Sequence, residues 1–214
     1  MADAISICTL LSLAGVVGFG IFGIRHDLKN AAKITPAAAT LGYEHLQVAD
    51  DFVAQNLSGM HRFHVGRVSH LFTGPSPTFF VHNAGKQTEG RGAGPQLVAA
   101  QKISLPVFVL RRRPPPIFGW RGQAVGPVGM PRVPLQMKFE QFYSLFSPEP
   151  SPELATLVER ALPCQDGWEV ESDGQWLVVM RIEFLQGSRL EHQFAWRREV
   201  LDSFAKQSLG LARG

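Results

Sequence analysis

The first stretch of the chain is apolar without interruption. Residues 4–24 read AISICTLLSLAGVVGFGIFGI, a run of 21 positions with no charged side chain. A helix of that length rises about 30 Å at 1.5 Å per residue, which matches the apolar core of a bilayer. The pattern therefore predicts a retained transmembrane helix. Three regions follow from it: an anchor at 1–24, a juxtamembrane linker at 25–40 and a cytoplasmic domain at 41–214.

Basic residues follow the apolar run: Arg25, Lys29 and Lys33. Because basic residues stay on the cytoplasmic side of a membrane, they predict a single-pass protein of the inner membrane with its N-terminus outside. Small residues inside the run let a second helix approach closely: Ala14, Gly15 and Gly18. They predict a packing face for a partner helix, although glycine is common in membrane helices in any case.

Beyond residue 40 the apolar positions alternate between helical and strand-like spacing. Helices are predicted over 41–57, after the capping pair Ser151–Pro152, and over 188–210. Strands are predicted near 62–66, 77–83, 101–110 and 134–143, and in a hairpin that turns at Asp173–Gly174. Because the elements do not alternate as βαβ units, we predict an α+β fold, an antiparallel sheet with helices packed on one face.

Composition and charge narrow the class of protein. The 214 residues are 45% hydrophobic and 18% charged, with a formal net charge of +3. A packed core is therefore expected, and the scattered Lys and Arg argue against a nucleic-acid partner. The two cysteines, Cys8 and Cys164, supply no disulfide framework and no metal-binding pair.

Three histidines stand close together in the stretch GMHRFHVGRVSH: His61, His64 and His70. If this stretch is a strand, His61 and His64 point to opposite faces. We therefore predict structural or surface histidines, and no catalytic, cofactor-binding or metal-binding residue. The alternative is a membrane-tethered enzyme or a ligand or metal sensor that uses these histidines with nearby carboxylates, which are Glu44, Asp50 and Asp51.

A long segment rich in Pro and Gly begins at residue 111 and combines basic with aromatic side chains. Its candidate contact residues are Arg111, Arg112, Arg113, Phe118, Trp120 and Arg121. An extended arm of this composition is suited to a partner protein or to anionic lipid headgroups. The alternative is a solvated loop that packs on its own domain.

Several short patterns together carry a resemblance. The triplet LGY follows the apolar run, Phe139, Phe142, Tyr143 and Phe146 form an F-x-x-F-Y-S-L-F element, and residues 168–179 read WEVESDGQWLVV. In this order the chain resembles a broad group of uncharacterised bacterial single-pass membrane proteins. Its layout is similar to that of the H subunit of purple-bacterial reaction centres.

The anchor, the arm and the lack of a catalytic constellation together predict a function. We expect a non-enzymatic, membrane-anchored accessory or scaffold subunit that stabilises a larger membrane complex, such as a photosynthetic or respiratory one. Its predicted partners are other membrane protein subunits and the lipid bilayer, including anionic lipids. No cofactor is expected.

Overall fold

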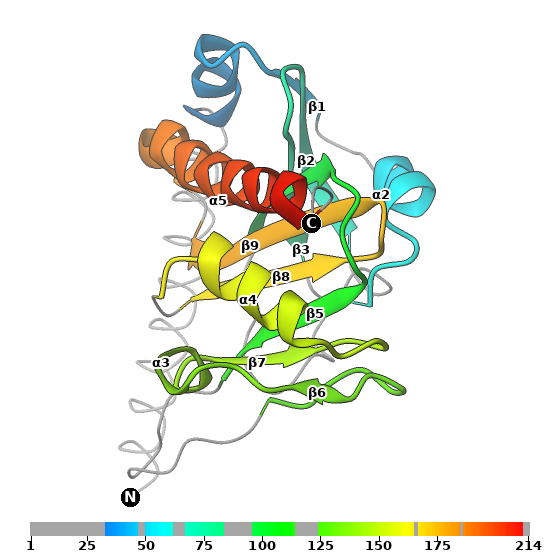
Figure 1. Ribbon diagram of the computed structural model, residues 1–214. Helices are drawn as coiled ribbons and strands as arrows, with labels where there is room; N and C mark the ends of the chain where they lie inside the picture. The colour runs from blue at the N-terminus through cyan, green and yellow to red at the C-terminus, as the bar shows by residue number, and fades with distance from the viewer. Residues whose placement is uncertain are drawn as a thin grey trace, which may run out of the picture.

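Strands of the computed structural model form a nine-stranded sheet in the order β1-β2-β3-β4-β9-β8-β5-β7-β6, and neighbouring strands are antiparallel (Figure 1). The structure describes residues 33–46, 50–61, 67–83, 96–113, 124–164, 167–184 and 186–211. The strands are β1 (Glu44–Leu46), β2 (Arg67–Thr73), β3 (Thr78–Asn83), β4 (Gln96–Lys102), β5 (Phe108–Arg112), β6 (Arg132–Val133), β7 (Tyr143–Phe146), β8 (Trp168–Ser172) and β9 (Trp176–Phe184). The helices are α2 (Asp50–Asn56), α3 (Met137–Glu140), α4 (Pro152–Ala161), the 3-10 turn η1 (Gly187–Arg189) and α5 (Leu190–Leu211).

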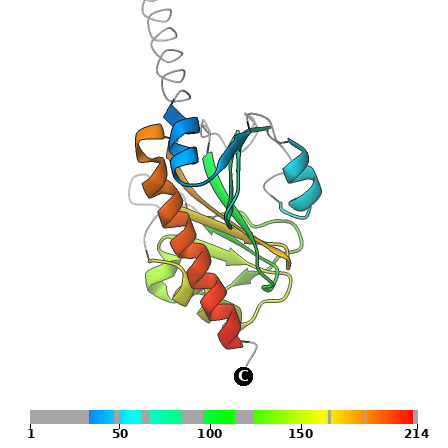
Figure 2. The ribbon, with the colours of Figure 1, turned by 90° about the horizontal axis from the view of Figure 1, so that it is seen from above.

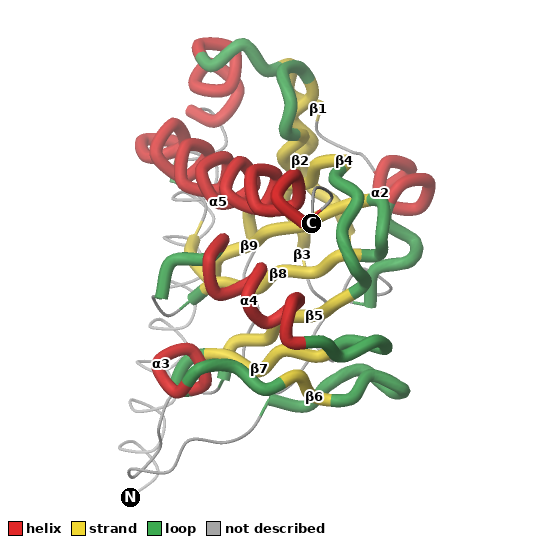
Figure 3. Tube along the Cα trace, in the orientation of Figure 1, coloured by secondary structure: helices red, strands yellow, loops and turns green. Residues whose placement is uncertain are grey.

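The larger core lies between one face of the sheet and the helices α4 and α5, which cross the strands side by side (Figure 3). Phe194 of α5 stacks on Phe79 of β3 with ring centroids 3.8 Å apart. Phe204 of α5 lies over Phe108 of β5 in the same way, with centroids 6.0 Å apart. Aromatic burial of this kind fixes α5 along the sheet.

The opposite face of the sheet is also apolar, and α2 covers part of it (Figure 2). Here Phe80, Val98 and Met180 pack with Leu57 and Met60, which follow α2 in the chain. The prediction that helices pack on one face is therefore wrong. The physical reason is that β3, β4 and β9 carry apolar side chains on both faces, so that both faces must be shielded from water.

The beginning of the described chain also differs from its prediction. Residues 33–40 are helical, and Gly42, with a φ of +81°, ends that helix. The amide of Gly42 donates to the Ala39 carbonyl and that of Tyr43 to the Ala38 carbonyl, the hydrogen-bond pattern of a glycine C-cap. Residues 41–57 therefore do not form one helix. They contain this cap, β1 and α2, with 47–49 outside the described residues.

Local signals in the C-terminal half are confirmed. Ser151 caps α4 through a hydrogen bond from the Leu154 amide to its hydroxyl, 3.1 Å long. Asp173–Gly174 turns between β8 and β9, and the last helix is α5. Two strand predictions are wrong in detail. The segment 101–110 is divided between the end of β4 and the start of β5, and 134–143 contains α3.

The prediction of a membrane anchor is not supported by the described helices. In the part of the chain that the structure describes, no helix is both long and apolar enough to cross a membrane. The longest helix among the described residues, α5, carries charged side chains on its exposed side, such as Glu199, Asp202 and Lys206. Residues 4–24, for which the span was predicted, lie outside the described residues. We do not retain a single-pass architecture.

Candidate functional site

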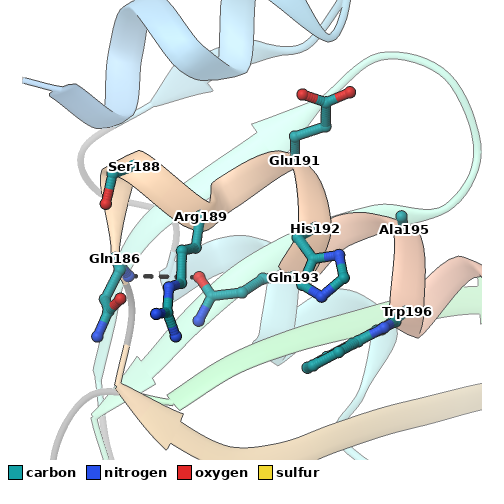
Figure 4. A pocket seen from close by; sticks show the side chains of 8 residues that line it. All are labelled: Gln186, Ser188, Arg189, Glu191, His192, Gln193, Ala195 and Trp196. Atoms are coloured by element: carbon teal, nitrogen blue, oxygen red, sulfur yellow. Dashed lines mark hydrogen bonds between the residues drawn. The ribbon is translucent and has the colours of Figure 1, made fainter.

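A groove of about 630 Å³ lies at the start of α5, next to the turn η1. Its lining combines hydrogen-bonding, charged and flat apolar side chains (Figure 4): Gln186, Ser188, Arg189, Glu191, His192, Gln193, Ala195 and Trp196. Most of these side chains are exposed, whereas Gln193 is buried. The Gln193 side chain accepts a hydrogen bond from the Gln186 amide at 3.3 Å, which ties the turn to the helix.

Trp196 is held in a column of stacked side chains at one end of the groove. The guanidinium carbon of Arg181 lies 4.4 Å from the Trp196 ring centroid and 5.5 Å from that of Trp168. Trp196 also lies against His192, with ring centroids 4.0 Å apart. Cation–π contacts of this kind restrict the indole ring. Trp196 therefore presents a fixed aromatic surface to the groove.

The helix that carries the groove is itself anchored by a fully buried arginine. Arg197 has 0% exposure, and its guanidinium donates to three backbone carbonyls, those of Leu97, Gln193 and Arg181. The first and last of these lie on β4 and β9. The start of α5 is thus bonded directly to the middle of the sheet, which makes the groove a preformed surface.

The groove lacks the contacts that a hydrolytic centre needs. Ser188 and His192 share the groove, yet no hydrogen bond joins them among the described contacts. Glu191 precedes His192 directly, and adjacent residues of a helix do not face each other, so that Glu191 does not orient the imidazole. Arg189 and Glu191 point in different directions (Figure 4). The arrangement is suited to contact with a ligand through several separate polar groups.

A second polar cluster lies at the β1 edge of the sheet. The Nε2 atom of His45 is 2.7 Å from the Nδ1 atom of His70, and the Nδ1 atom of His45 is 2.6 Å from the Thr35 hydroxyl. The His45 ring also lies against Phe72, with centroids 5.0 Å apart. Burial lowers the pKa of His45. Burial, followed by the charge of His45, lowers the pKa of His70.

The three histidines that stand close together in the sequence, His61, His64 and His70, do not form a cluster among the described residues. His61 is exposed after α2, and its backbone amide donates to the buried Glu171 carboxylate. His70 lies on β2 with His45 as its partner, and His64 lies outside the described residues. Over the ranges that the structure covers, no group of three or more His, Cys, Asp or Glu side chains could hold a metal ion.

The arginines predicted to contact a partner or lipid lie on β5 and directly after it. Arg111 is 3.9 Å from the Glu169 carboxylate of β8, and Arg113 donates to the Glu140 carbonyl at 2.6 Å. Arg112 is the last residue of β5. The remaining predicted contact residues lie outside the described residues: Phe118, Trp120 and Arg121. So do Ala14, Gly15, Gly18, Arg25 and Lys29, whereas Lys33 is exposed at the start of the helical segment 33–40.

Comparison with known proteins yields little. No family model and no curated protein matches the chain. A solved structure that is similar is the mycobacterial trehalose monomycolate transport factor A, TtfA, with 10% sequence identity and a TM-score of 0.48. The similarity covers 80% of this chain and 92% of that one. At this level it carries no argument about what this protein does.

These findings correct the predicted function. No described helix is suited to cross a membrane. The predictions of a membrane-anchored scaffold subunit and of an inner-membrane location are therefore not retained, and neither is a photosynthetic or respiratory role.

Proposed function

We propose that this protein acts by binding and not by catalysis, and that the groove at the start of α5 binds a polypeptide segment with an acidic side chain. The observation that carries the proposal is the column Trp168–Arg181–Trp196–His192, which holds Trp196 at the groove. Tryptophan and arginine dominate the binding energy of protein interfaces when they are preorganised.

The other lining residues fit the backbone and side chains of a peptide. Gln186 and Ser188 can both donate and accept hydrogen bonds, as backbone amides and carbonyls require. Arg189 is exposed and no ion pair is found for it in the described contacts, and its planar guanidinium can bind a carboxylate through two parallel hydrogen bonds. An acidic residue next to an apolar or aromatic one would therefore contact Arg189 and Trp196 together.

Selection from a phage-displayed library of random dodecapeptides tests this function. We expect the full chain to enrich peptides with Asp or Glu beside an aromatic or aliphatic residue. Arg189→Glu should weaken binding of a synthetic copy of such a peptide at least tenfold, because charge reversal opposes the carboxylate. Trp196→Ala should weaken it by a similar factor, since it removes the aromatic contact.

A matched control lies on the same helix. Lys206→Glu makes the same charge reversal at an exposed position of α5 away from the groove, and it should leave the affinity unchanged. Equal losses in Arg189→Glu and Lys206→Glu would mean that net charge alone attracts the peptide. That result, or the absence of any enriched peptide, would refute the proposed function.

A further inference from the structure

We propose that the hydrogen bond between His45 and His70 is an acid-sensitive switch, which holds β1 on the edge of the sheet and is lost when both imidazole rings are protonated. The Nε2 atom of His45 lies 2.7 Å from the Nδ1 atom of His70, and the two residues belong to the neighbouring strands β1 and β2. The ring centroids are 4.9 Å apart and the ring planes differ by 27°, so that the two nitrogens meet head-on. The switch is independent of the groove at the start of α5.

The number of protons on the pair decides whether the bond exists. Between two neutral rings, one nitrogen donates its hydrogen atom and the facing nitrogen accepts it. A first added proton goes to a nitrogen that does not face the other ring, and the bond persists between an imidazolium and an imidazole. A second added proton leaves a hydrogen atom on both facing nitrogens and two positive charges in contact. Loss of the bond is therefore coupled to the second proton.

The bond lies at a short strand on the outside of the sheet. β1 pairs only with β2, and it does so at three positions. The Nδ1 atom of His45 lies 2.6 Å from the hydroxyl of Thr35, so that the same ring connects the helical segment 33–40 to β1. Phe72 of β2 lies against this ring at a centroid distance of 5.0 Å. One imidazole thus joins three segments of the chain.

The environment of the pair opposes protonation. Both side chains are half-buried, and burial lowers the pKa of His45. Burial, followed by the charge of His45, lowers the pKa of His70. The charge that resists a second proton therefore comes from the pair itself.

Other charged or titratable side chains of the surrounding segments are bonded elsewhere or point elsewhere. They include Lys33, Glu44, His82 and Arg198. Lys33 and Glu44 are exposed. His82 of β3 pairs with Val68 on the opposite face of the sheet, and Arg198 of α5 donates to the Tyr43 hydroxyl at 2.7 Å. None of them is a cause of the lowered pKa values.

The opening should stay local to β1. Ile34, Ala38 and Tyr43, which precede β1 in the chain, are buried in the larger core. The helical segment 33–40 should therefore stay on the domain in acid while β1 separates from β2. The outer side of β2 then becomes the edge of the sheet, with unpaired backbone N–H and C=O groups.

Amide hydrogen exchange of the full chain at pH 7 and at pH 5, corrected for the intrinsic effect of pH on exchange, tests the switch. For peptides that cover residues 44–46 and 71–73, protection should fall at least tenfold between the two pH values in the wild type. The reason is that the open form binds protons that the closed form excludes. Peptides that cover the paired strands β5 and β7 should keep their protection.

Two variants each remove one titrating ring and keep a side chain that can donate or accept a hydrogen bond: His45→Gln and His70→Gln. Each should reduce the fall in protection at β1 to less than about threefold, and either one is sufficient if the other does not fold. His192→Gln is the control, because it removes an exposed histidine of α5, and it should behave as the wild type does.

Three results would overturn the proposal. In the first, β1 of the wild type loses no more protection at pH 5 than β5 and β7 do. In the second, both histidine variants keep the wild-type dependence on pH. In the third, His192→Gln abolishes that dependence.

Discussion

Arg197 of α5 donates a 3.0 Å hydrogen bond to the carbonyl of Leu97 at the point where the pairing of β4 with β9 is irregular. The register shifts between Gln96 and Val98, so that the regular ladder is interrupted at Leu97. The buried guanidinium also binds the carbonyls of Gln193 and Arg181. A buried carbonyl without a donor is costly, and one side chain here satisfies three.

Arg197→Met should therefore destabilise the fold strongly. It keeps most of the side-chain volume and removes every donor, and we expect a loss of roughly 2–4 kcal/mol in the free energy of unfolding. Urea denaturation measures it. The neighbour Arg198 donates to the Tyr43 hydroxyl at 2.7 Å and is partly exposed, so Arg198→Met should cost about 1 kcal/mol. Equal losses in the two variants would contradict the role assigned to Arg197.

Phe194 is the aromatic centre of the larger core. It stacks on Phe79 and meets the edges or faces of Tyr43 and Phe72, each at a centroid distance of 5.3 Å. Phe194→Ala should cost roughly 3–5 kcal/mol, because the cavity cannot collapse against a sheet. Leu209→Ala, at an exposed position of the same helix, should change stability by no more than about 0.5 kcal/mol in parallel thermal and urea unfolding. A small effect at Phe194 would show that the stack is not part of the stable core.

The histidine pair should make stability depend on pH. The folded-state pKa of both His45 and His70 lies below the ordinary value of 6.5, so that the unfolded chain binds more protons between the two values. This contribution to stability is complete above pH 6.5 and is lost as the pH falls through the lowered values. Urea midpoints measured with EDTA across this range should fall in the wild type. The midpoints should fall less with decreasing pH in the double variant His45→Gln/His70→Gln. If the double variant shows the same dependence of the midpoint on pH as the wild type, the histidine pair is not the cause.

Ser151 offers a test of a purely local interaction. Its hydroxyl accepts the Leu154 amide at the start of α4, and Ser151→Ala should cost about 1 kcal/mol. Thr156→Ala provides the matched control, since the Thr156 hydroxyl only bonds back to the Pro152 carbonyl within the exposed helix surface. That variant should be neutral or slightly stabilising, because alanine has the higher helix propensity. If Ser151→Ala were as neutral as the control, the cap would contribute nothing.

Elements with strong local signals could be predicted from the sequence, and α4 with its Ser151 cap is the clearest. The second apolar face of the sheet was missed, although a signal for it was present: the strands TFFVHN and QLVAAQK show little alternation of polar and apolar residues. Continuous apolar runs are typical of strands buried on both sides, and they could have predicted that a helix such as α2 covers the second face.

The two polar sites depend on contacts between distant residues. His45 meets His70 only because Gly42 ends the helix 33–40 and lets β1 pair with β2, whereas helical spacing had placed His45 inside a helix. For the groove at the start of α5, the sequence contains one signal that could have predicted a surface contact. Trp196 does not belong to the buried stripe of α5, which contains Leu190, Phe194, Leu201 and Phe204, and a large aromatic residue off such a stripe indicates a surface contact.

The position of β9 between β4 and β8 has a consequence for synthesis on the ribosome. Lys102 of β4 pairs with Trp176 of β9, a residue made much later. At about 5–20 residues per second, the roughly 75 intervening residues take some 4 to 15 seconds to appear, during which the β4 edge has no strand to pair with. A nascent chain of this protein therefore exposes an apolar strand edge for seconds, and chaperones that recognise such edges should bind it until β9 emerges.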